Sequence, residues 1–531
     1  MKQFEFNNDQ YLMGHLFLDA MKCKPDNICQ IDAATGESET NGSVLRRSIQ
    51  LARCLRRFGI LPGDVLALGG RNHLDLNIPF YAALLNGMPI SGVDPQFKYS
   101  EIKTHFKVSL PRVAFCQKSN LDDFKRVIKE LELNTELICF DDGEDSMRNF
   151  IKQHDGQEDE EDFAPLEFNP EKIYAWLVST GGTTGKLKLA AFKHRTFFAK
   201  LQGLKTMFYK EDTYKQHGET RMALHLSPVQ WISAYFNSVT YPMVGLTKVM
   251  TSAQPTTEHI IEIINKYKPV TAILGPTIIR AMLKNEKHCD FTCFNYIMVG
   301  GSKFCEDTNI ELRKRLRPDA SVTEIYGQTE NLGPILVPNP KGPIGNCGKA
   351  VDEWHRVKLM DTETGKEITQ PHVSGEIWSK GPSFTEYYNN PEETANTFTE
   401  DGWYKTGDVL YRDEDGNHYF VERLNMLIKY RNYHVIPTEL EAVIREHPGV
   451  FDVNVTSIPH EEDGQHPVAC VMKKQGSIVT AEEIKDLVAS KLSDSQHLRG
   501  GVLFMDELPL TSSGKVAREK LRQMVLTAHR E

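Results

Sequence analysis

The feature that most constrains the fold of this chain is a repeated alternation of helical and strand patterns along its 531 residues. Residues 44–60 have the apolar spacing of a helix, and residues 61–70 follow as a turn and a buried strand. The same order recurs at 119–133 with 135–142, and again within 257–275. Helices that alternate with strands favour an α/β fold with largely parallel sheets. Because the chain is too long for one compact core, we expect several domains.

The pattern changes in the last third of the chain. Between about 345 and 422, short strands are separated by Gly, Asp and Asn turns, which predicts a β-rich subdomain. After about 424, a helix at 437–448 and a strand at 450–458 begin a small α+β unit that continues to the end of the chain.

The charge and composition of the chain indicate which classes of binding partner are not expected. The net charge of -10 argues against nucleic acid or an anionic membrane. No basic-then-apolar signal pattern starts the chain, and its most apolar long stretch, 76–93, is too interrupted to span a bilayer.

Cys289 and Cys293 near His288 lack a second ligand pair, so structural zinc is not expected. We expect an intracellular, mainly cytoplasmic protein; no C-terminal peroxisomal tripeptide is visible, and the oligomeric state is left open.

Residues 179–190 read Ser-Thr-Gly-Gly-Thr-Thr-Gly-Lys-Leu-Lys-Leu-Ala. This is not a Walker loop, because Thr180 stands in place of its first glycine and Leu187 in place of its hydroxyl residue. The composition still suits a phosphate: glycines let backbone N–H groups converge on an anion, threonines add donors, and lysine adds charge. A linker between subdomains is the alternative interpretation.

Four further short motifs follow in order: 324–331, 401–410, 421–441 and 507–521. Each alone is typical of a solvated turn. Together, in this order and at these separations, they resemble the adenylate-forming superfamily of acyl-CoA synthetases, 4-coumarate–CoA ligases and beetle luciferases. The resemblance covers nearly the whole chain. It is nearest to luciferase-like acyl-CoA synthetases, as the sequences of residues 381–394 and 498–509 indicate.

The resemblance implies an architecture and a reaction. Residues 1–422 would form an N-terminal adenylation domain of two α/β subdomains plus a β-barrel subdomain. Residues 423–426 would be a hinge, and 427–531 a small α+β lid that rotates between two steps. In the first step a carboxylate attacks the α-phosphate of ATP, with Mg²⁺, to give an acyl-adenylate and pyrophosphate. In the second step the thiol of coenzyme A displaces AMP.

The resemblance also implies the site residues. The catalytic set would be Lys515, which bridges the α-phosphate and the carboxylate, Lys429, which assists thioester formation, Thr329 at the α-phosphate, and Glu330, which holds Mg²⁺. Tyr326 would stack on adenine, and Asp408 and Arg423 would bind the ribose. The full nucleotide-binding set is Thr180, Gly181, Gly182, Thr183, Thr184, Gly185, Lys188, Gly301, Tyr326, Asp408 and Arg423. For Lys429, a solvated lysine on a strand is an equal alternative.

The acyl pocket is expected at 226–236 and at the turn 299–303, with Gln230, Trp231, Gly300 and Gly301 as its residues. An indole at Trp231 favours an apolar pocket for an alkyl or aryl acid, although Trp231 could also serve packing alone. The expected substrate is therefore a fatty or aryl acid.

The chain departs from the family pattern at a few positions. Gly181, Leu187 and Leu189 stand where relatives usually carry Ser, Pro and Gly, which predicts a looser or displaced loop. Asn432 replaces a usual glycine beside the path of coenzyme A. An alternative function follows from these changes: a degraded relative that binds nucleotide or an acyl ligand without full thioester formation.

Overall fold

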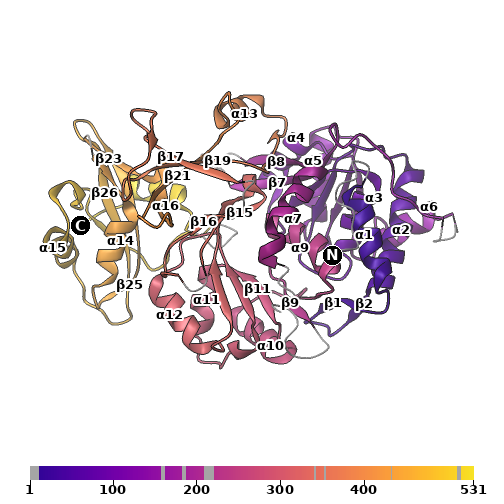
Figure 1. The fold of residues 1–531 in the computed structure, drawn as a ribbon, viewed down its shortest axis with the longest axis horizontal. Helices are drawn as coiled ribbons and strands as arrows, with labels where there is room; N and C mark the ends of the chain where they lie inside the picture. The colour runs from indigo at the N-terminus through magenta and orange to yellow at the C-terminus, as the bar shows by residue number, and fades with distance from the viewer. Residues whose placement is uncertain are drawn as a thin grey trace. The chain divides into compact units, whose positions relative to one another are not determined.

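The computed structural model describes residues 11–156, 162–181, 187–208, 221–339, 342–351, 355–431, 433–510 and 516–531. The described residues form two compact units, each with its own sheets (Figure 1). The first unit takes the described residues of Met1–Gly182, Lys186–Arg356 and Lys380–Trp403. The second takes Val357–Ser379 and the described residues of Tyr404–Glu531.

The first unit contains a seven-stranded sheet in the order β20-β8-β7-β4-β3-β5-β6. Strands β3 to β7 pair in parallel, and β8 and β20 extend the sheet as antiparallel strands. The strands are β3 (Leu66–Gly69), β4 (Ile90–Val93), β5 (Val113–Cys116), β6 (Glu136–Cys139), β7 (Tyr174–Gly181), β8 (Leu187–Lys193) and β20 (Glu386–Tyr387). The helices between them are α2 (Asn41–Phe58), α3 (Asn77–Asn86), α4 (Tyr99–Ser109), α5 (Leu121–Glu130) and α6 (Met147–His154).

The helices of this sheet carry the expected local signals. Thr40 caps α2 by accepting a hydrogen bond from the backbone N–H of Ser43 at 3.2 Å, and Gly59 ends the helix in a left-handed conformation. Phe106 of α4 and Phe124 of α5 are buried against strands β3, β4 and β5. The amphipathic face of each helix is therefore what joins it to the sheet.

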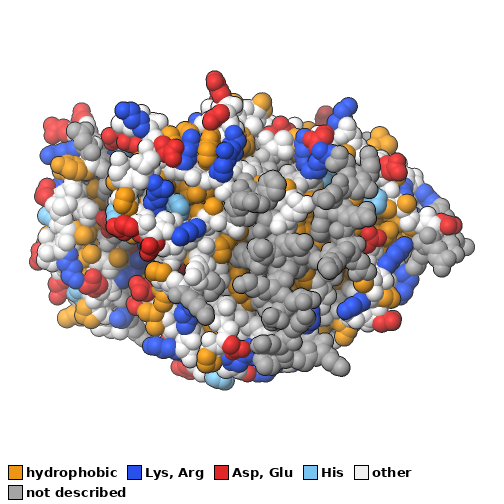
Figure 2. Space-filling model, viewed as in Figure 1, with side chains coloured by type: hydrophobic (Ala, Val, Ile, Leu, Met, Phe, Trp, Pro, Cys, Tyr) orange, Lys and Arg blue, Asp and Glu red, His pale blue; other side chains and the backbone are white. Residues whose placement is uncertain are grey.

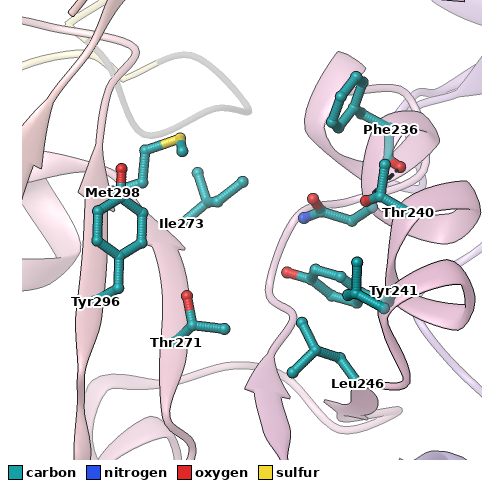
Figure 3. Close-up of a pocket in the computed structure, with 10 residues that line it drawn as sticks. Phe236, Thr240, Tyr241, Leu246, Thr271, Ile273, Tyr296 and Met298 are labelled. Atoms are coloured by element: carbon teal, nitrogen blue, oxygen red, sulfur yellow. Dashed lines mark hydrogen bonds between the residues drawn. The ribbon is translucent and has the colours of Figure 1, made fainter. Parts of the chain in front are cut away.

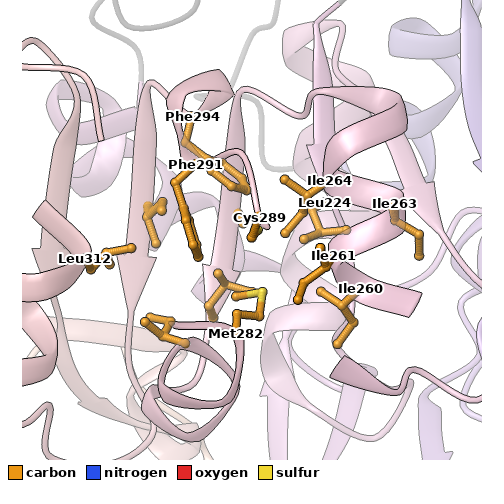
Figure 4. Close-up of a cluster of buried hydrophobic side chains, with 14 of the residues drawn as sticks. Leu224, Ile260, Ile261, Ile263, Ile264, Met282, Cys289, Phe291, Phe294 and Leu312 are labelled. Atoms are coloured by element: carbon orange, nitrogen blue, oxygen red, sulfur yellow. The ribbon is translucent and has the colours of Figure 1, made fainter. Parts of the chain in front are cut away.

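A second seven-stranded sheet in the same unit has the order β13-β12-β11-β9-β10-β1-β2 and is parallel except for β1–β2. Its core gathers isoleucines of α10 with Phe291, Phe294 and Met282 (Figure 4). The strands are β1 (Ile28–Asp32), β2 (Ser38–Thr40), β9 (Met222–Leu224), β10 (Thr247–Met250), β11 (Thr271–Leu274), β12 (Tyr296–Val299) and β13 (Ser321–Glu324). The helices are α9 (Ile232–Val244), α10 (Thr257–Tyr267), α11 (Pro276–Lys284) and α12 (Glu306–Arg315).

The remaining elements of the first unit border these sheets. A small sheet follows β13 and has the order β14-β15-β16, formed by β14 (Tyr326–Gln328), β15 (Gly333–Val337) and β16 (Lys349–Ala350). The helices α1 (Met13–Cys23), α7 (His194–Phe208) and α13 (Pro391–Thr397) complete the unit.

The second unit contains two sheets of its own. One has the order β18-β17-β19-β21-β22, with β17 (Arg356–Met360), β18 (Glu367–Ile368), β19 (Gly375–Lys380), β21 (Tyr404–Arg412) and β22 (His418–Arg423). The other consists of β23 (Ile428–Tyr430), β24 (Tyr433–Val435), β25 (Val450–His460), β26 (Gly464–Lys473) and β27 (Val502–Phe504). Helices α14 (Pro437–Arg445) and α15 (Ala481–Lys491) bury Leu440, Ile444 and Ile484 against this second sheet, and α16 (Arg518–Thr527) packs on β25.

The α/β fold predicted from the sequence is confirmed, and the predicted β-rich segment corresponds to the sheet of β17, β18, β19, β21 and β22. The division of the chain at 422 and the hinge at 423–426 stay predictions. Within the described ranges, no helix has the length and apolarity needed to cross a membrane. On the face shown in Figure 2, acidic and basic side chains are interspersed over the described residues.

Candidate functional site

The glycine-rich stretch lies between two paired strands. Strands β7 and β8 form an antiparallel pair in which Thr180 lies opposite Lys188 and Gly181 lies opposite Leu187. Residues 182–186 connect these strands and lie outside the described residues, so the predictions for Gly182, Thr183, Thr184 and Gly185 are not tested. Thr180 is buried. The choice between a phosphate-binding loop and a linker therefore stays open.

Strand pairing places Lys188 beside two residues that come much later in the chain. Its Nζ lies 2.6 Å from Oε2 of Glu393 and 5.0 Å from the ring centroid of Tyr387. Both partners are positioned by β20, because Tyr387 pairs with Ala190 of β8 and Glu393 lies in the first turn of α13. The Lys188 side chain is only 13% exposed, so its charge is held at one place.

Tyr387 also fixes the carboxylate of Glu330. The tyrosine hydroxyl donates a hydrogen bond of 2.8 Å to Oε1 of Glu330, and the backbone N–H of Phe384 donates one of 2.8 Å to the Glu330 carbonyl. Glu330 is buried, and it lies with Thr329 in a single 3₁₀ turn. Tyr387 therefore connects the ammonium of Lys188 and the carboxylate of Glu330, two residues that the sequence predicted to share a site.

The turn that carries Glu330 is built on a close approach between backbones. Tyr326 is buried in β14, and a β-bulge separates it from Gly327. A Cβ atom at Gly327 would lie 2.2 Å from the Gly333 carbonyl oxygen, so only glycine fits there. Gly327 thus lets β14 and β15 hold Tyr326, Thr329 and Glu330 in one tight hairpin.

The oxygen ligands at this turn suit a hard cation. Mg²⁺ is usually bound by one or two carboxylates, with waters and substrate phosphates completing its shell. Glu330 offers one carboxylate whose orientation Tyr387 fixes, and Thr329 adds a half-buried hydroxyl in the same turn. These residues fit a magnesium ion shared with phosphate.

A neighbouring acid, Glu324, was not singled out from the sequence. Burial raises the pKa of Glu324 from 4.5 to about 7, although the backbone N–H of Phe304, 3.1 Å from Oε1, and the charge of Lys303 both oppose the shift. Glu324 ends β13, directly before the turn that carries Tyr326. A glutamate in a strand pattern looks like an ordinary surface residue, so only burial reveals its altered pKa.

The second unit pairs the two residues predicted to bind ribose. Asp408 of β21 lies opposite Arg423 of β22, and Nε of Arg423 is 2.7 Å from Oδ1 of Asp408. The Asp408 side chain is 2% exposed and that of Arg423 is 40% exposed. Thr406 Oγ1 accepts a hydrogen bond of 3.1 Å from the backbone N–H of Asp408.

Next to Arg423, Glu422 is buried and reaches the C-terminal helix. Its Oε2 lies 3.6 Å from Nη1 of Arg518, whose Nη2 lies 3.2 Å from Oε1 of Glu441. Burial raises the pKa of Glu441, while the charges of Arg518 and Arg445 oppose that shift. The two glutamates share one arginine, which ties β22 to α14 and α16 within the second unit.

Lys429 is exposed in β23, and its backbone N–H donates to Oε1 of Gln465 at 2.9 Å. The structure therefore leaves its side chain in solvent, as either interpretation of this lysine requires. Asn432 and Lys515 lie outside the described residues, so their predicted roles are not tested.

A pocket lies between α9 and the strands β11 and β12. Phe236, Thr240 and Tyr241 face the strand side chains across it (Figure 3). It is lined by Phe236, Asn237, Thr240, Tyr241, Val244, Leu246, Thr271, Ile273, Tyr296 and Met298. The lining contains no Asp, Glu, Lys, Arg or His side chain. Burial raises the pKa of Tyr296 to about 12, which keeps this hydroxyl protonated at neutral pH. Such a lining suits an apolar group with a few hydrogen bonds.

The residues predicted to form the acyl pocket do not line this pocket, although they are close in sequence to residues that do. Of the predicted stretch 226–236, only Phe236 lines it. Trp231 caps α9 and is half-buried, and Gln230 is buried. Gly301 has a positive φ of 94°. The roles of Gln230, Trp231, Gly300 and Gly301 stay predictions. The lining could have been found from its spacing, since 236, 237, 240, 241 and 244 share one helix face and 271, 273, 296 and 298 alternate on two strands.

Comparison with known proteins identifies the family to which the chain belongs. Residues 17–389 match the AMP-binding enzyme family, and residues 439–515 match the AMP-binding enzyme C-terminal domain. Luciferin 4-monooxygenase of Photuris pensylvanica is 30% identical over 508 residues, which cover 94% of this chain and 92% of that protein. A 4-coumarate–CoA ligase of Pinus taeda is 30% identical over 518 residues, covering 94% and 92%.

Two solved structures share the fold. ATP-bound MatB from Rhodopseudomonas palustris superposes with a TM-score of 0.84 at 21% identity, covering 97% of this chain and 99% of that one. The luciferase-like enzyme from the nonluminescent mealworm Zophobas morio has a TM-score of 0.70 at 27% identity, covering 79% of this chain and 97% of that one.

The role of Tyr387 can be tested by removing one hydroxyl. We expect Tyr387→Phe to lower the rate of ATP-dependent pyrophosphate release by roughly tenfold, because the Glu330 carboxylate loses the donor that orients it. The drop should shrink as Mg²⁺ concentration is raised, which a purely structural loss would not show. Tyr388→Phe, at the adjacent tyrosine, is the matched control and should stay within twofold of the wild type.

The raised pKa of Glu324 predicts a specific pH dependence of stability. The folded protein keeps the proton up to about pH 7, whereas the unfolded chain releases it near 4.5. Stability from this group is therefore lost as pH rises through that window, by up to about 3 kcal/mol. Urea unfolding measures this loss. Between about pH 5 and about pH 8, the free energy of unfolding of Glu324→Gln should rise relative to that of the wild type by a comparable amount. Glu306→Gln, an exposed carboxylate, should show no such trend; equal trends for both variants would contradict the assignment.

Proposed function

Since the chain belongs to the AMP-binding enzyme family, matched over residues 17–389 and 439–515, we propose that it is an ATP-dependent carboxylic acid–CoA ligase working through an acyl-adenylate. The observation that carries the proposal is the arrangement of Lys188, Tyr387 and Glu330. A buried carboxylate and a nearby ammonium, both oriented by one tyrosine, form a site for a magnesium-bound polyphosphate.

In the adenylation step, the main chemical demand is to neutralise charge on the phosphates as the acid attacks the α-phosphorus. Lys188 would contact the β- and γ-phosphates, and Thr329 would donate to the α-phosphate. Glu330 would hold Mg²⁺, which supplies Lewis-acid polarisation of phosphate oxygens. In the structure, Oε2 of Glu393 lies 2.6 Å from Nζ of Lys188. A partly exposed ion pair contributes roughly 1 kcal/mol or less, so phosphate can displace the glutamate.

The other nucleotide contacts follow from the family pattern. Tyr326 would stack on adenine, and Asp408 would accept the ribose hydroxyls while Arg423 balances its charge at 2.7 Å. Thr180, Gly181, Gly182, Thr183, Thr184 and Gly185 would bind phosphate through the glycine-rich loop, with Gly301 beside the nucleotide. Lys515 would bridge the α-phosphate and the acid, and Lys429 would assist attack by coenzyme A.

The acid is proposed to be a fatty or aryl acid. The uncharged lining of the pocket between α9, β11 and β12 excludes water from an alkyl or aromatic group, and its few hydroxyls fix orientation. A second charged group on the acid would be buried without a partner there, which is costly. Gln230, Trp231 and Gly300 are proposed to border the carboxyl end of the same substrate.

The decisive experiment measures both steps separately. The protein is incubated with ATP, Mg²⁺ and a panel of fatty and aryl acids, and pyrophosphate is measured with and without coenzyme A. We expect acid-dependent pyrophosphate release and a matching CoA thioester. Pyrophosphate without thioester would support the alternative of a relative that stops at the adenylate, a result expected if Asn432 blocks coenzyme A. No pyrophosphate from any acid would refute the ligase proposal.

Lys188 offers a sharper test within one strand. We expect Lys188→Ala to lower pyrophosphate release by roughly a hundredfold, because a positioned charge on the phosphates is lost. Lys193→Ala is the control, since Lys193 lies on the same strand and pairs with Glu171 at 3.3 Å. The assignment of Lys188 would be wrong if the two variants retained similar rates.

A further inference from the structure

The hairpin that joins β25 and β26 carries a histidine, an aspartate and a second histidine: His460, Asp463 and His466. One nitrogen or oxygen atom of each lies within 4.8 Å of the others. Among the described residues, this is the one such group of three or more His, Cys, Asp or Glu side chains. Nothing in the proposed ligase chemistry uses it.

The three side chains converge on one carboxylate oxygen. Oδ2 of Asp463 lies 2.8 Å from Nε2 of His466 and 3.6 Å from Nδ1 of His460. The two imidazole rings are stacked, with centroids 4.0 Å apart and planes 21° apart. Ligand atoms around a tetrahedral ion lie about 3.4 Å apart, as bond lengths of about 2.0–2.1 Å require. Rotation of the two rings out of their stacked arrangement would bring one nitrogen of each to this spacing from Oδ2 of Asp463.

The surrounding hairpin fixes this arrangement. His460 pairs with Gly464 across the strands, and Ile458 pairs with His466, so both histidines are set by the same register. The Asp463 backbone N–H lies 3.2 Å from Nδ1 of His460, and Nε of Arg431 donates to the other carboxylate oxygen at 2.7 Å. Asp463 is 13% exposed. A carboxylate held through its second oxygen is the usual outer support of a metal ligand.

We propose that His460, Asp463 and His466 bind a divalent transition-metal ion of the Zn²⁺ class. Two imidazoles and one carboxylate favour Zn²⁺ and its neighbours over Mg²⁺ or Ca²⁺, which prefer all-oxygen shells. The half-exposed position of His460 leaves a fourth place for water. On binding, the hydrogen bond between His466 and Asp463 is replaced by one bond from each residue to the ion, with His466 as a neutral imidazole whose proton lies on its other ring nitrogen.

The hairpin that carries the three ligands also contacts β23, so a bound ion would affect how these strands are held together. Gly464 pairs with Tyr430 of β23, and the backbone N–H of Arg431 donates to the Asp463 carbonyl at 2.7 Å. An ion on the hairpin would therefore strengthen the junction of β23 with the β25–β26 pair. Its effect is on stability, and it is independent of whether the protein forms a thioester.

The test uses the full chain with any affinity tag removed and metals stripped by a chelator. Zn²⁺ is titrated by calorimetry, and Co²⁺ is added to a second sample for visible absorption. We expect one equivalent of Zn²⁺ to bind, with a rise in unfolding temperature and d–d bands of four- or five-coordinate Co²⁺. His460→Ala, Asp463→Asn and His466→Ala should each weaken binding at least about tenfold.

His497→Ala is the matched control, because His497 lies 3.5 Å from Asp494 in a pair that lacks a third ligand. It should bind Zn²⁺ as the wild type does. Circular dichroism of each variant confirms that the fold is retained, and Asp463→Asn preserves shape if an alanine variant unfolds. The proposal is overturned if the wild type takes up no stoichiometric Zn²⁺, or if the control loses binding as the three variants do.

Discussion

The hydrogen bond from Tyr387 to Glu330 is the contact on which the arrangement of the first unit's candidate site depends. Glu330 lies in the turn after β14, whereas Tyr387 lies on the far edge strand β20, and 57 positions separate them. The bond requires that β20 pair with β8, and that pairing also brings Glu393 to Lys188. One cross-strand register therefore positions a carboxylate, an ammonium and its counterion together.

That register also explains why the changed glycine-rich segment is compatible with the fold. Leu189 stands where relatives usually carry glycine, but it lies in β8, opposite Ser179, and is fully buried against Leu177 and Ala191. The backbone N–H of Tyr388 donates to its carbonyl at 2.8 Å. An extended strand position needs no left-handed backbone, so the larger side chain adds apolar burial without strain. Two of the three departures, Leu187 and Leu189, thus lie in the described strand β8.

The sequence predicted what depends on local patterns. Helix α2 was predicted from the apolar spacing of residues 44–60. Lys188, Glu330 and Asp408 were singled out through the family resemblance that their short motifs carry, and their roles stay predictions. Tyr387 and Glu393 could not be predicted, because their roles arise only when a distant segment pairs with β8. The pocket lining was partly missed although its spacing marks one helix face and two strands, because sequence spacing does not show that these separate segments face one another.

Burial of charge gives an independent reason to connect Asp408 with function. Moving a carboxylate out of water costs several kcal/mol even after the protein relaxes, and a single arginine restores this only in good geometry. Asp408 is 2% exposed, while Arg423 opposite it is 40% exposed. A hydrophobic pair in those strand positions would stabilise the sheet as well. A polar ligand is a second way to offset the cost of a buried acid. The proposed ribose suits this position because its two hydroxyls can donate hydrogen bonds to the Asp408 carboxylate beside the charge of Arg423.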